Sequence, residues 1–157
     1  MKRLIAIAAI TMLVPATSQA THTVTEELYD TGTYDVTVGV RVGGTSFGYT
    51  DPDNRIGGAL FEAPGLKPVR VVVNDAGKYP VGISAAQDFN NNGIAGQTGE
   101  PNVLGCGGSL SLASSAVPFD PNRPVWVFVR AIDTQCGATN LATSGSVELY
   151  VEVPVEH

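Results

Sequence analysis

The sequence predicts an all-β protein, a single antiparallel β-sandwich or barrel of about eight or nine strands. Three observations predict this class. Apolar residues alternate with polar ones along most of the chain, which is the period of a half-buried strand. No window of eleven residues has the i, i+3, i+4, i+7 spacing of an amphipathic helix. Clusters of Asp, Asn, Gly and Pro separate the apolar stretches and favour turns.

The N-terminal 20 residues are predicted to be a secretory signal peptide, residues 1–20, followed by one domain over 21–157. Residues 2–3 are basic, residues 4–14 are apolar except for one threonine, and residue 20 is a small alanine suited to cleavage. The alternative is a retained anchor, but the apolar run is shorter than the ~20 residues that cross a bilayer. We therefore expect a secreted protein with no membrane span, located extracellularly, at the cell surface or in the periplasm.

The first half of the domain contains one strong strand pattern and three weaker ones. In Thr33–Val42, Tyr34 and every second residue after it are apolar, with polar or small residues between them. This alternation places the apolar set on one face. Weaker strand patterns occur at Thr23–Tyr29, Thr45–Tyr49 and Ala59–Ala63.

The second half contains the strongest strand patterns. Pro124–Ile132 is apolar at nearly every position, as expected for a central strand that is covered on both faces. Ser146–Val153 alternates, with valine and leucine predicted inward and Glu148, Tyr150 and Glu152 outward. The remaining strand predictions are Val69–Val73, Val81–Ala85 and Ser109–Ser114.

Charge and histidine content restrict the function classes. Removing the two basic residues of the signal leaves seven Lys and Arg against fifteen Asp and Glu, a net charge of −8. Nucleic acids and anionic membranes are therefore not expected as partners. His22 and His157 lie near the two chain ends, which disfavours a Ser-His-Asp triad and histidine-based zinc sites. A non-enzyme is expected; paired-carboxylate hydrolysis stays open because Asp and Glu occur in several loops.

Cys106 and Cys136 are expected to form a disulfide. An even cysteine count in an exported protein usually indicates one, and the alternatives are two buried thiols or an intermolecular bond. In the chain-entropy model, closing a loop of this length stabilises the fold by ~3.5 kcal/mol. The spacing is not C-x-x-C, so we expect a structural bond.

A candidate calcium loop lies between Gln87 and Gly108. Asp88, Asn90 and Asn92 alternate ahead of Gly93, as in the opening of a D-x-[DN]-x-[DN]-G loop, and Glu100 follows one residue later than an EF-hand requires. We predict a β-protein calcium site using these four oxygen-bearing side chains, with weak affinity because only two are carboxylates. The alternative is an Asn-Gly-rich connection that satisfies its own backbone through Asx turns.

A second candidate site is an aromatic pair. Phe47 and Tyr49 are two residues apart, so in a strand they share one face, and glycines and acidic turn residues surround them. Such a face is a candidate platform for a sugar or polymer. The alternative is that both rings pack into the core.

Several stretches between residues 59 and 153 follow one another in a family-like order: Phe61-Glu62-Ala63-Pro64-Gly65, the strands Val69–Val73 and Val81–Ala85, Asp88 with its Asn-rich turn, Pro124–Arg130 and Gly145–Val151. This order of elements resembles the bacterial pre-peptidase C-terminal domain. The resemblance implies a jelly-roll-like β-sandwich and a non-catalytic secreted module, some relatives of which bind calcium or extracellular polymers such as collagen and polysaccharide.

Together these observations favour a secreted, non-catalytic module that binds an extracellular polymer or protein, assisted by calcium. An alternative from another class is a subunit of a surface filament or matrix that self-assembles by donating the strand-like segment Thr21–Tyr29 to the next protomer. Asp30-Thr31-Gly32 would separate that segment from the next strand. An inhibitor of an extracellular enzyme is a third hypothesis.

Overall fold

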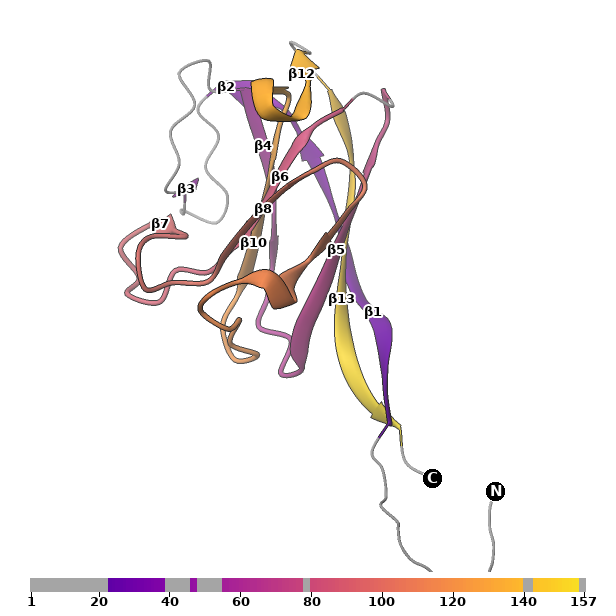
Figure 1. The fold of residues 1–157 in the computed structure, drawn as a ribbon, viewed down its shortest axis with the longest axis vertical. Coiled ribbons are helices and arrows are strands. Elements are labelled where there is room, and N and C mark those ends of the chain that lie inside the picture. The colour runs from indigo at the N-terminus through magenta and orange to yellow at the C-terminus, as the bar shows by residue number, and fades with distance from the viewer. Residues whose placement is uncertain (1–22, 39–45, 48–54, 78–79, 140–142, 156–157) are drawn as a thin grey trace, which may run out of the picture.

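The computed structural model describes residues 23–38, 46–47, 55–77, 80–139 and 143–155, and it confirms the predicted all-β sandwich (Figure 1). Its two main sheets are sheet A, with strand order β1-β13-β5-β9, and sheet B, with order β2-β4-β10-β6-β8. All strand pairs within them are antiparallel. The strands are β1 (Thr23–Asp35), β2 (Thr37–Val38), β4 (Arg55–Phe61), β5 (Lys67–Asp75), β6 (Gly82–Ala86), β8 (Asn102–Cys106), β9 (Ser109–Ser111), β10 (Val125–Arg130) and β13 (Ser144–Val155).

The topology is that of a jelly roll. When short β2 is set aside, the other eight strands of the two sheets follow the order 1-8-3-6 in sheet A and 2-7-4-5 in sheet B, counted along the chain. Successive strands thus alternate between the sheets around two Greek keys, except for β6 and β8, which are neighbours in sheet B. The remaining elements are two two-stranded pairs, β3 (Ser46–Phe47) with β7 (Ile94–Ala95) and β11 (Ile132–Asp133) with β12 (Ala138–Thr139), and the 3₁₀ turns η2 (Leu112–Ser114) and η3 (Thr134–Cys136). No helix in the described part of the chain is long and apolar enough to cross a membrane.

The main core lies between the two sheets and follows the predicted alternation. Val147, Leu149 and Val151 on β13 point inward, as predicted, and are at most 2% exposed. The other large members from both sheets are Tyr34, Phe61, Val71, Val73, Ile83, Val103, Leu110, Val125, Val127 and Val129. Burial of these β-branched and aromatic side chains is the main contribution to stability.

A second apolar cluster covers the outer face of sheet B. Trp126 and Phe128 of β10 pack there with Ala86 and Ala95, and Ile56 and Leu60 lie at the margin. All six residues of β10 are buried. The prediction that this strand is central and covered on both faces is therefore confirmed.

Residues 23–38 correct two sequence predictions. Thr23–Tyr29 and the start of Thr33–Val42 form one strand, β1, which pairs with β13 along its whole length and passes through Asp30-Thr31-Gly32 without a turn. A register shift between Leu28 and Asp30 absorbs the extra residue. The chain then crosses to sheet B at β2, so Thr33–Val42 is not a single strand. Alternation alone does not reveal this crossing. Tyr34 lies before the crossing and Val36 lies at it, yet both side chains belong to the same core.

Two further boundaries differ from the prediction. Ser109–Ser114 is a three-residue strand followed by the turn η2, although Leu110 and Leu112 are both buried as expected. Residues 102–106, which the sequence places inside a loop, form the edge strand β8. Its glycine, its asparagine and its exposed Leu104 hide the strand pattern. The predicted signal peptide, His22 and His157 lie outside the described residues.

Candidate functional site

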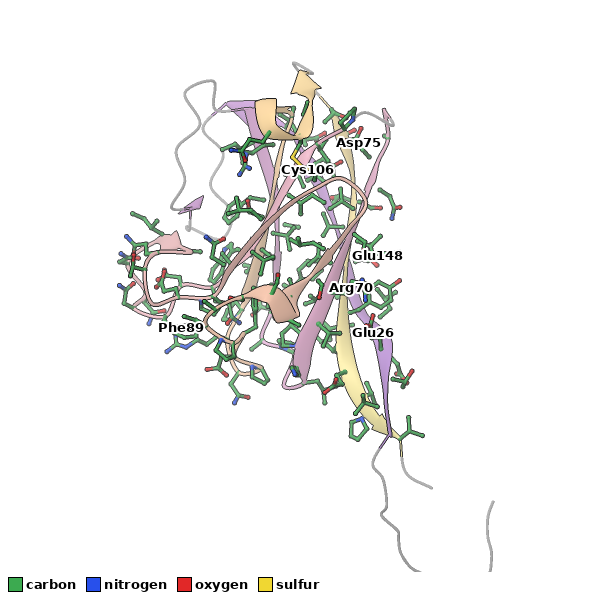
Figure 2. The ribbon with its side chains drawn as sticks, viewed as in Figure 1. Glu26, Arg70, Asp75, Phe89, Cys106 and Glu148 are labelled. Carbon is green, nitrogen blue, oxygen red and sulfur yellow. A yellow bond between two sulfur atoms is a disulfide. The ribbon has the colours of Figure 1, made fainter. Side chains whose placement is uncertain are left out.

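The predicted calcium residues lie in the 87–101 loop, which connects β6 to β8 and passes the outer side of sheet B (Figure 1). Within it, Ala95 of β7 packs against the Trp126–Phe128 cluster. The loop is therefore fixed to the sheet through an apolar contact. Figure 2 shows Phe89 at this side of the molecule.

Both predicted carboxylates are buried and accept hydrogen bonds from the loop backbone. Asp88, 5% exposed, accepts from the N–H groups of Asn92 at 3.3 Å and Gly93 at 2.9 Å. Glu100, 7% exposed, accepts from Phe89 at 2.8 Å and Gln97 at 2.9 Å. An ionised carboxylate has about four positions that can accept a hydrogen bond. The backbone N–H groups therefore fill only part of the acceptor capacity of Asp88 and Glu100.

The two asparagines form the Asx turns of the alternative interpretation. Asn90 Oδ1 accepts from the Asn92 N–H at 3.2 Å, and Asn92 Oδ1 accepts from the Ile94 N–H at 3.0 Å. Both side chains are exposed, and Asn91 between them has φ of 57°, a left-handed conformation that asparagine tolerates. The four predicted ligands thus belong to one loop. The Asp88 and Glu100 carboxylates accept hydrogen bonds from its backbone, and the side-chain oxygens of Asn90 and Asn92 close its Asx turns.

Calcium binding at this loop would rely on neutral oxygen atoms in addition to the two carboxylates. The described residues contain no group of three or more His, Cys, Asp or Glu side chains placed to hold a metal ion. Hard cations also accept amide and backbone oxygens, which Asn90, Asn92 and the turns supply. A cation here would share carboxylates with backbone N–H groups, so a low affinity is expected.

A polar clamp that the sequence did not reveal holds the loop against residues 120–123. Gln87 is fully buried; its Nε2 donates to the carbonyls of Asp120 at 2.9 Å and Arg123 at 3.2 Å, and its Oε1 accepts from the Asp120 N–H at 2.8 Å. The Arg123 guanidinium lies 5.0 Å from the centroid of the Phe89 ring. The only available sequence signal was a glutamine directly after an apolar strand.

The disulfide Cys106–Cys136 is confirmed, with an S–S distance of 2.06 Å. It joins the end of edge strand β8 to the turn η3, between β11 and β12. Figure 2 shows Cys106 near the end of the sandwich that carries β12. The bond thus closes one edge of sheet B onto the β11–β12 connection, a position consistent with a structural role.

The aromatic platform is described only in part. Phe47 belongs to β3, whose two residues pair in parallel with β7 of the 87–101 loop. Tyr49 lies outside the described residues. The platform therefore stays a prediction, and the structure adds only that the backbone of β3 is adjacent to the candidate calcium loop.

The outer face of sheet A presents a polar and aromatic surface that the sequence predicted only as outward-facing side chains. Arg70 of β5 reaches across β13 to Glu26 of β1, with Nε–Oε1 at 2.9 Å and Nη2–Oε2 at 3.2 Å. Tyr150 on β13 donates to Glu148 at 3.1 Å. Figure 2 shows Arg70, Glu26 and Glu148 along this side of the molecule. Pairing of Arg70 with Glu26 was not predictable, because 44 residues separate them.

Electrostatics on this face follow from those pairs. The hydrogen bond from Arg70 lowers the pKa of the Glu26 carboxyl below its usual range. The Glu148 carboxylate, as an acceptor, raises the pKa of the Tyr150 hydroxyl. Both effects keep Glu26 ionised and Tyr150 neutral near pH 7. The face carries three carboxylates, Glu26, Glu148 and Glu152, and two bases, Arg70 and Lys67, of which Lys67 is paired with Glu152 in the strand register.

A buried tyrosine joins strands at one end of sheet A. Tyr34 donates to Asp75 Oδ1 at 2.5 Å, and Thr143 Oγ1 lies 2.7 Å from each carboxylate oxygen of Asp75. Burial, followed by the adjacent carboxylate, raises the pKa of Tyr34 well above its ordinary value. Gly145 is required beside them, because an added Cβ would lie 2.2 Å from the Asn74 carbonyl oxygen and 2.8 Å from the Tyr34 hydroxyl.

Comparisons with known proteins provide no family. No protein-family model matches the chain, and no curated protein matches it. Among solved structures, it is similar to a chain in the cryo-EM structure of Mud crab tombus-like virus at 3.3 Å resolution, with 12% identity and a TM-score of 0.30. That similarity covers 92% of this chain and 94% of the other. At this TM-score it supports no conclusion about function.

Proposed function

We propose that the protein is a secreted, non-catalytic β-sandwich module that binds an extracellular polymer or protein through the outer face of sheet A. One observation carries the proposal. Apolar, aromatic and hydrogen-bonding side chains lie exposed or half-buried side by side on that face: Val24, Leu28, Tyr150, Glu26 and Arg70. Such a combination provides apolar contact area together with groups that orient a ligand.

The register of the strands places these residues together. Leu28 pairs with Tyr150, and Tyr150 pairs with Arg70 on the next strand, so the three form a row across β1, β13 and β5. Glu26 and Val24 continue along β1 on the same face, because side chains alternate along a strand. On the outer face of sheet B, the central strand β10 is buried at all six positions, and its Trp126 and Phe128 belong to an apolar cluster. Sheet A is therefore the better candidate for ligand contact.

The described ionisable groups with shifted pKa values support a non-catalytic role. Each of them belongs to a pair that either joins β1 to β5 across β13, as Glu26 with Arg70 and Tyr34 with Asp75, or joins nearby positions of β13, as Tyr150 with Glu148. These pairs act as structural and surface contacts. A disulfide and a predicted signal peptide are both compatible with secretion.

A binding screen with matched variants tests this function. The purified domain is incubated with collagen, chitin, cellulose and cell-wall material, in calcium and in chelator. We expect capture on at least one of them, and loss of capture in Leu28→Ser combined with Tyr150→Ala. The control Leu104→Ser changes a leucine of sheet B that is 51% exposed, against 50% for Leu28. No capture on any material, or equal loss in the control, would contradict the proposal.

Calcium assistance is proposed at the 87–101 loop and is tested separately. If a cation shares the Asp88 and Glu100 carboxylates, millimolar calcium raises the melting temperature relative to chelator. Asp88→Asn would abolish that increase. A melting temperature that is unchanged by millimolar calcium would remove calcium from the proposal and leave the sheet A surface unaffected.

The alternative function, filament assembly by strand donation, remains a separate proposal that concerns the same strand. In the structure β1 pairs with β13 of its own chain from Thr23 to Asp35, the arrangement of an ordinary first strand. Deleting residues 21–30 decides between the hypotheses. A deletion variant that stays a folded monomer and no longer polymerises would favour donation. A wild-type chain that never forms polymers at high concentration would exclude donation.

A further inference from the structure

β1 leaves one edge of sheet A open. It is the end strand in the order β1-β13-β5-β9, and among the described residues no strand pairs with its other side. A strand of 13 residues with a free edge presents a row of backbone N–H and C=O groups to solvent. Figure 1 shows β1 and β13 continuing together beyond the body of the sandwich. The free edge is therefore accessible over that projecting part.

The first six residues of β1, Thr23–Leu28, make a regular template. They keep an unbroken register with β13 up to the shift between Leu28 and Asp30. The side chains of residues 24–28 are all exposed, with Val24 at 54% and Leu28 at 50%. A regular, exposed edge with apolar side chains at alternate positions is what an added strand requires.

Every charge on β1 is negative. The strand contains Glu26, Glu27, Asp30 and Asp35 and has no lysine or arginine. Glu26 and Glu27 are adjacent, so one side chain points to each face of the sheet. The next strand adds Glu148 and Glu152 on the outer face. A strand lying against this edge would meet carboxylates on both of its faces.

This charge pattern selects the occupant. Antiparallel pairing of two copies of β1 would bring acidic side chains beside one another, and like charges opposite each other on paired strands are destabilising. The two bases on the outer face, Arg70 and Lys67, lie on β5, which β13 separates from the edge of β1, and Arg70 is engaged by Glu26 at 2.9 Å. A segment that carries lysine or arginine at alternate positions would instead form cross-strand pairs with Glu26 and Glu27.

We infer that the free edge of β1 at Thr23–Leu28 accepts an extended, lysine- or arginine-rich segment of another protein by strand addition. This inference rests on the proposed binding function. It names the chemistry of the partner for the case in which that partner is a protein. Backbone hydrogen bonds along β1 supply affinity that does not depend on sequence, and the acidic side chains supply selectivity for basic partners.

The test uses the whole mature domain and three labelled synthetic peptides. The first alternates lysine with valine and threonine, the second replaces every lysine by glutamate, and the third keeps lysine but is N-methylated at each interior amide. Fluorescence anisotropy measures binding, and hydrogen exchange measures protection of the β1 amides. We expect the first peptide to bind, the other two to bind at least ~10-fold more weakly, and amides of residues 23–28 to gain protection.

A matched pair of variants assigns the binding to β1. Glu27→Lys reverses an exposed charge on the edge and is expected to weaken binding of the lysine peptide several-fold. Glu62→Lys makes the same change at an exposed position between β4 and β5, and binding is expected to stay within about twofold. Both variants replace exposed side chains, and equal melting temperatures confirm that both fold.

Three results would overturn the inference. Equal binding of the lysine peptide and its N-methylated form would show attraction by charge alone. Unchanged exchange in residues 23–28 would place the peptide elsewhere. Concentration-dependent dimers protected at β1 would assign the edge to a second copy. Loss of polymer capture in the Leu28–Tyr150 variant, with no peptide bound at β1, would leave the proposed function standing and remove only this inference.

Discussion

The outer faces of the two sheets differ sharply. On sheet B, β10 is buried at all six positions, and Trp126 and Phe128 lie beneath the 87–101 loop. On sheet A, the outward residues of β13 are half-buried and polar, and they lie beside an ion pair that is exposed to solvent. An apolar strand needs cover on both faces, whereas an alternating strand is stable with one face in water. The same sandwich thus has one face that is closed over its central strand and one that is available for contact.

Polar groups behave differently on the two faces. Where the loop covers sheet B, Gln87 makes three side-chain hydrogen bonds, because an unpaired buried amide would cost stability. On sheet A, Glu26 and Arg70 remain 43% and 39% exposed, and their pair contributes little in water. Polar residues therefore stabilise the closed face and give the open face its charge.

The largest expected effect is at the covered face of sheet B. Phe128→Ala removes a ring that is 1% exposed and leaves a cavity, so the free energy of unfolding should fall by about 3–4 kcal/mol. Leu28→Ala on the open face should change it by less than about 0.5 kcal/mol. Urea denaturation measures both. Similar losses in the two variants would contradict the distinction between a closed and an open face.

The second prediction concerns the clamp on the covering loop. Gln87→Ala removes the acceptor for the Asp120 N–H and the side-chain donor to the part-buried carbonyls of Asp120 and Arg123, at a cost of about 2–3 kcal/mol. Hydrogen exchange should rise first in residues 88–100 and 120–123. Gln97→Ala, in which only an exposed side-chain bond to Asn92 is lost, serves as the control. Equal stability of the two variants would indicate that the apolar contact alone holds the loop.

The third prediction uses pH at the end of sheet A. The folded-state pKa of Tyr34 is raised, so the neutral phenol adds stability below its ordinary pKa of about 10, and that stability is lost as the pH rises above it. Tyr34→Phe should lower the free energy of unfolding by about 1–2 kcal/mol at pH 7 and remove this part of the alkaline loss. Denaturation at pH 7 and pH 11 measures both. Parallel pH curves for wild type and variant would contradict a buried, neutral Tyr34.

The smallest effect is expected for the ion pair on the open face. The pKa of Glu26 is lowered in the folded state, so the pair stabilises the protein above the ordinary pKa of glutamate and this contribution is lost as the pH falls. A double-mutant cycle of Glu26→Gln and Arg70→Gln should give the weakest coupling of the set, and high salt should remove it. A coupling as strong as the Gln87 effect would mean that the pair is shielded from water.

Much of the fold was predictable because burial follows residue pattern. The continuous apolar run of β10 predicted a central strand, and the alternation in β13 predicted which side chains face the core. Turn residues separated most strands correctly. The failures were at Asp30-Thr31-Gly32, where a long strand continues through residues that favour a turn, and at β8, whose glycine and exposed leucine do not alternate. Both depend on pairing with distant strands, which local pattern does not record.

The candidate sites show the same limit. Asp88, Asn90, Asn92 and Glu100 were identified because they are close in sequence, and the structure places them in one loop with mutual Asx turns. Gln87, Arg123 and the Arg70–Glu26 pair were missed because their partners are 33 to 44 residues away. A glutamine or arginine alone does not indicate whether its partner is solvent, a carbonyl or a carboxylate.

By itself, the sequence determined the fold class, the inward side of each strong strand and the disulfide, because strand period, turn chemistry and cysteine number are local or countable. The tertiary structure decided which sheet face is covered and which strand ends sheet A, and it gives the acidic edge of that strand no partner among the described residues. These properties depend on strand order. Strand order results from contacts between segments that are distant in sequence, and those contacts form because the two sheets bury their apolar faces against each other.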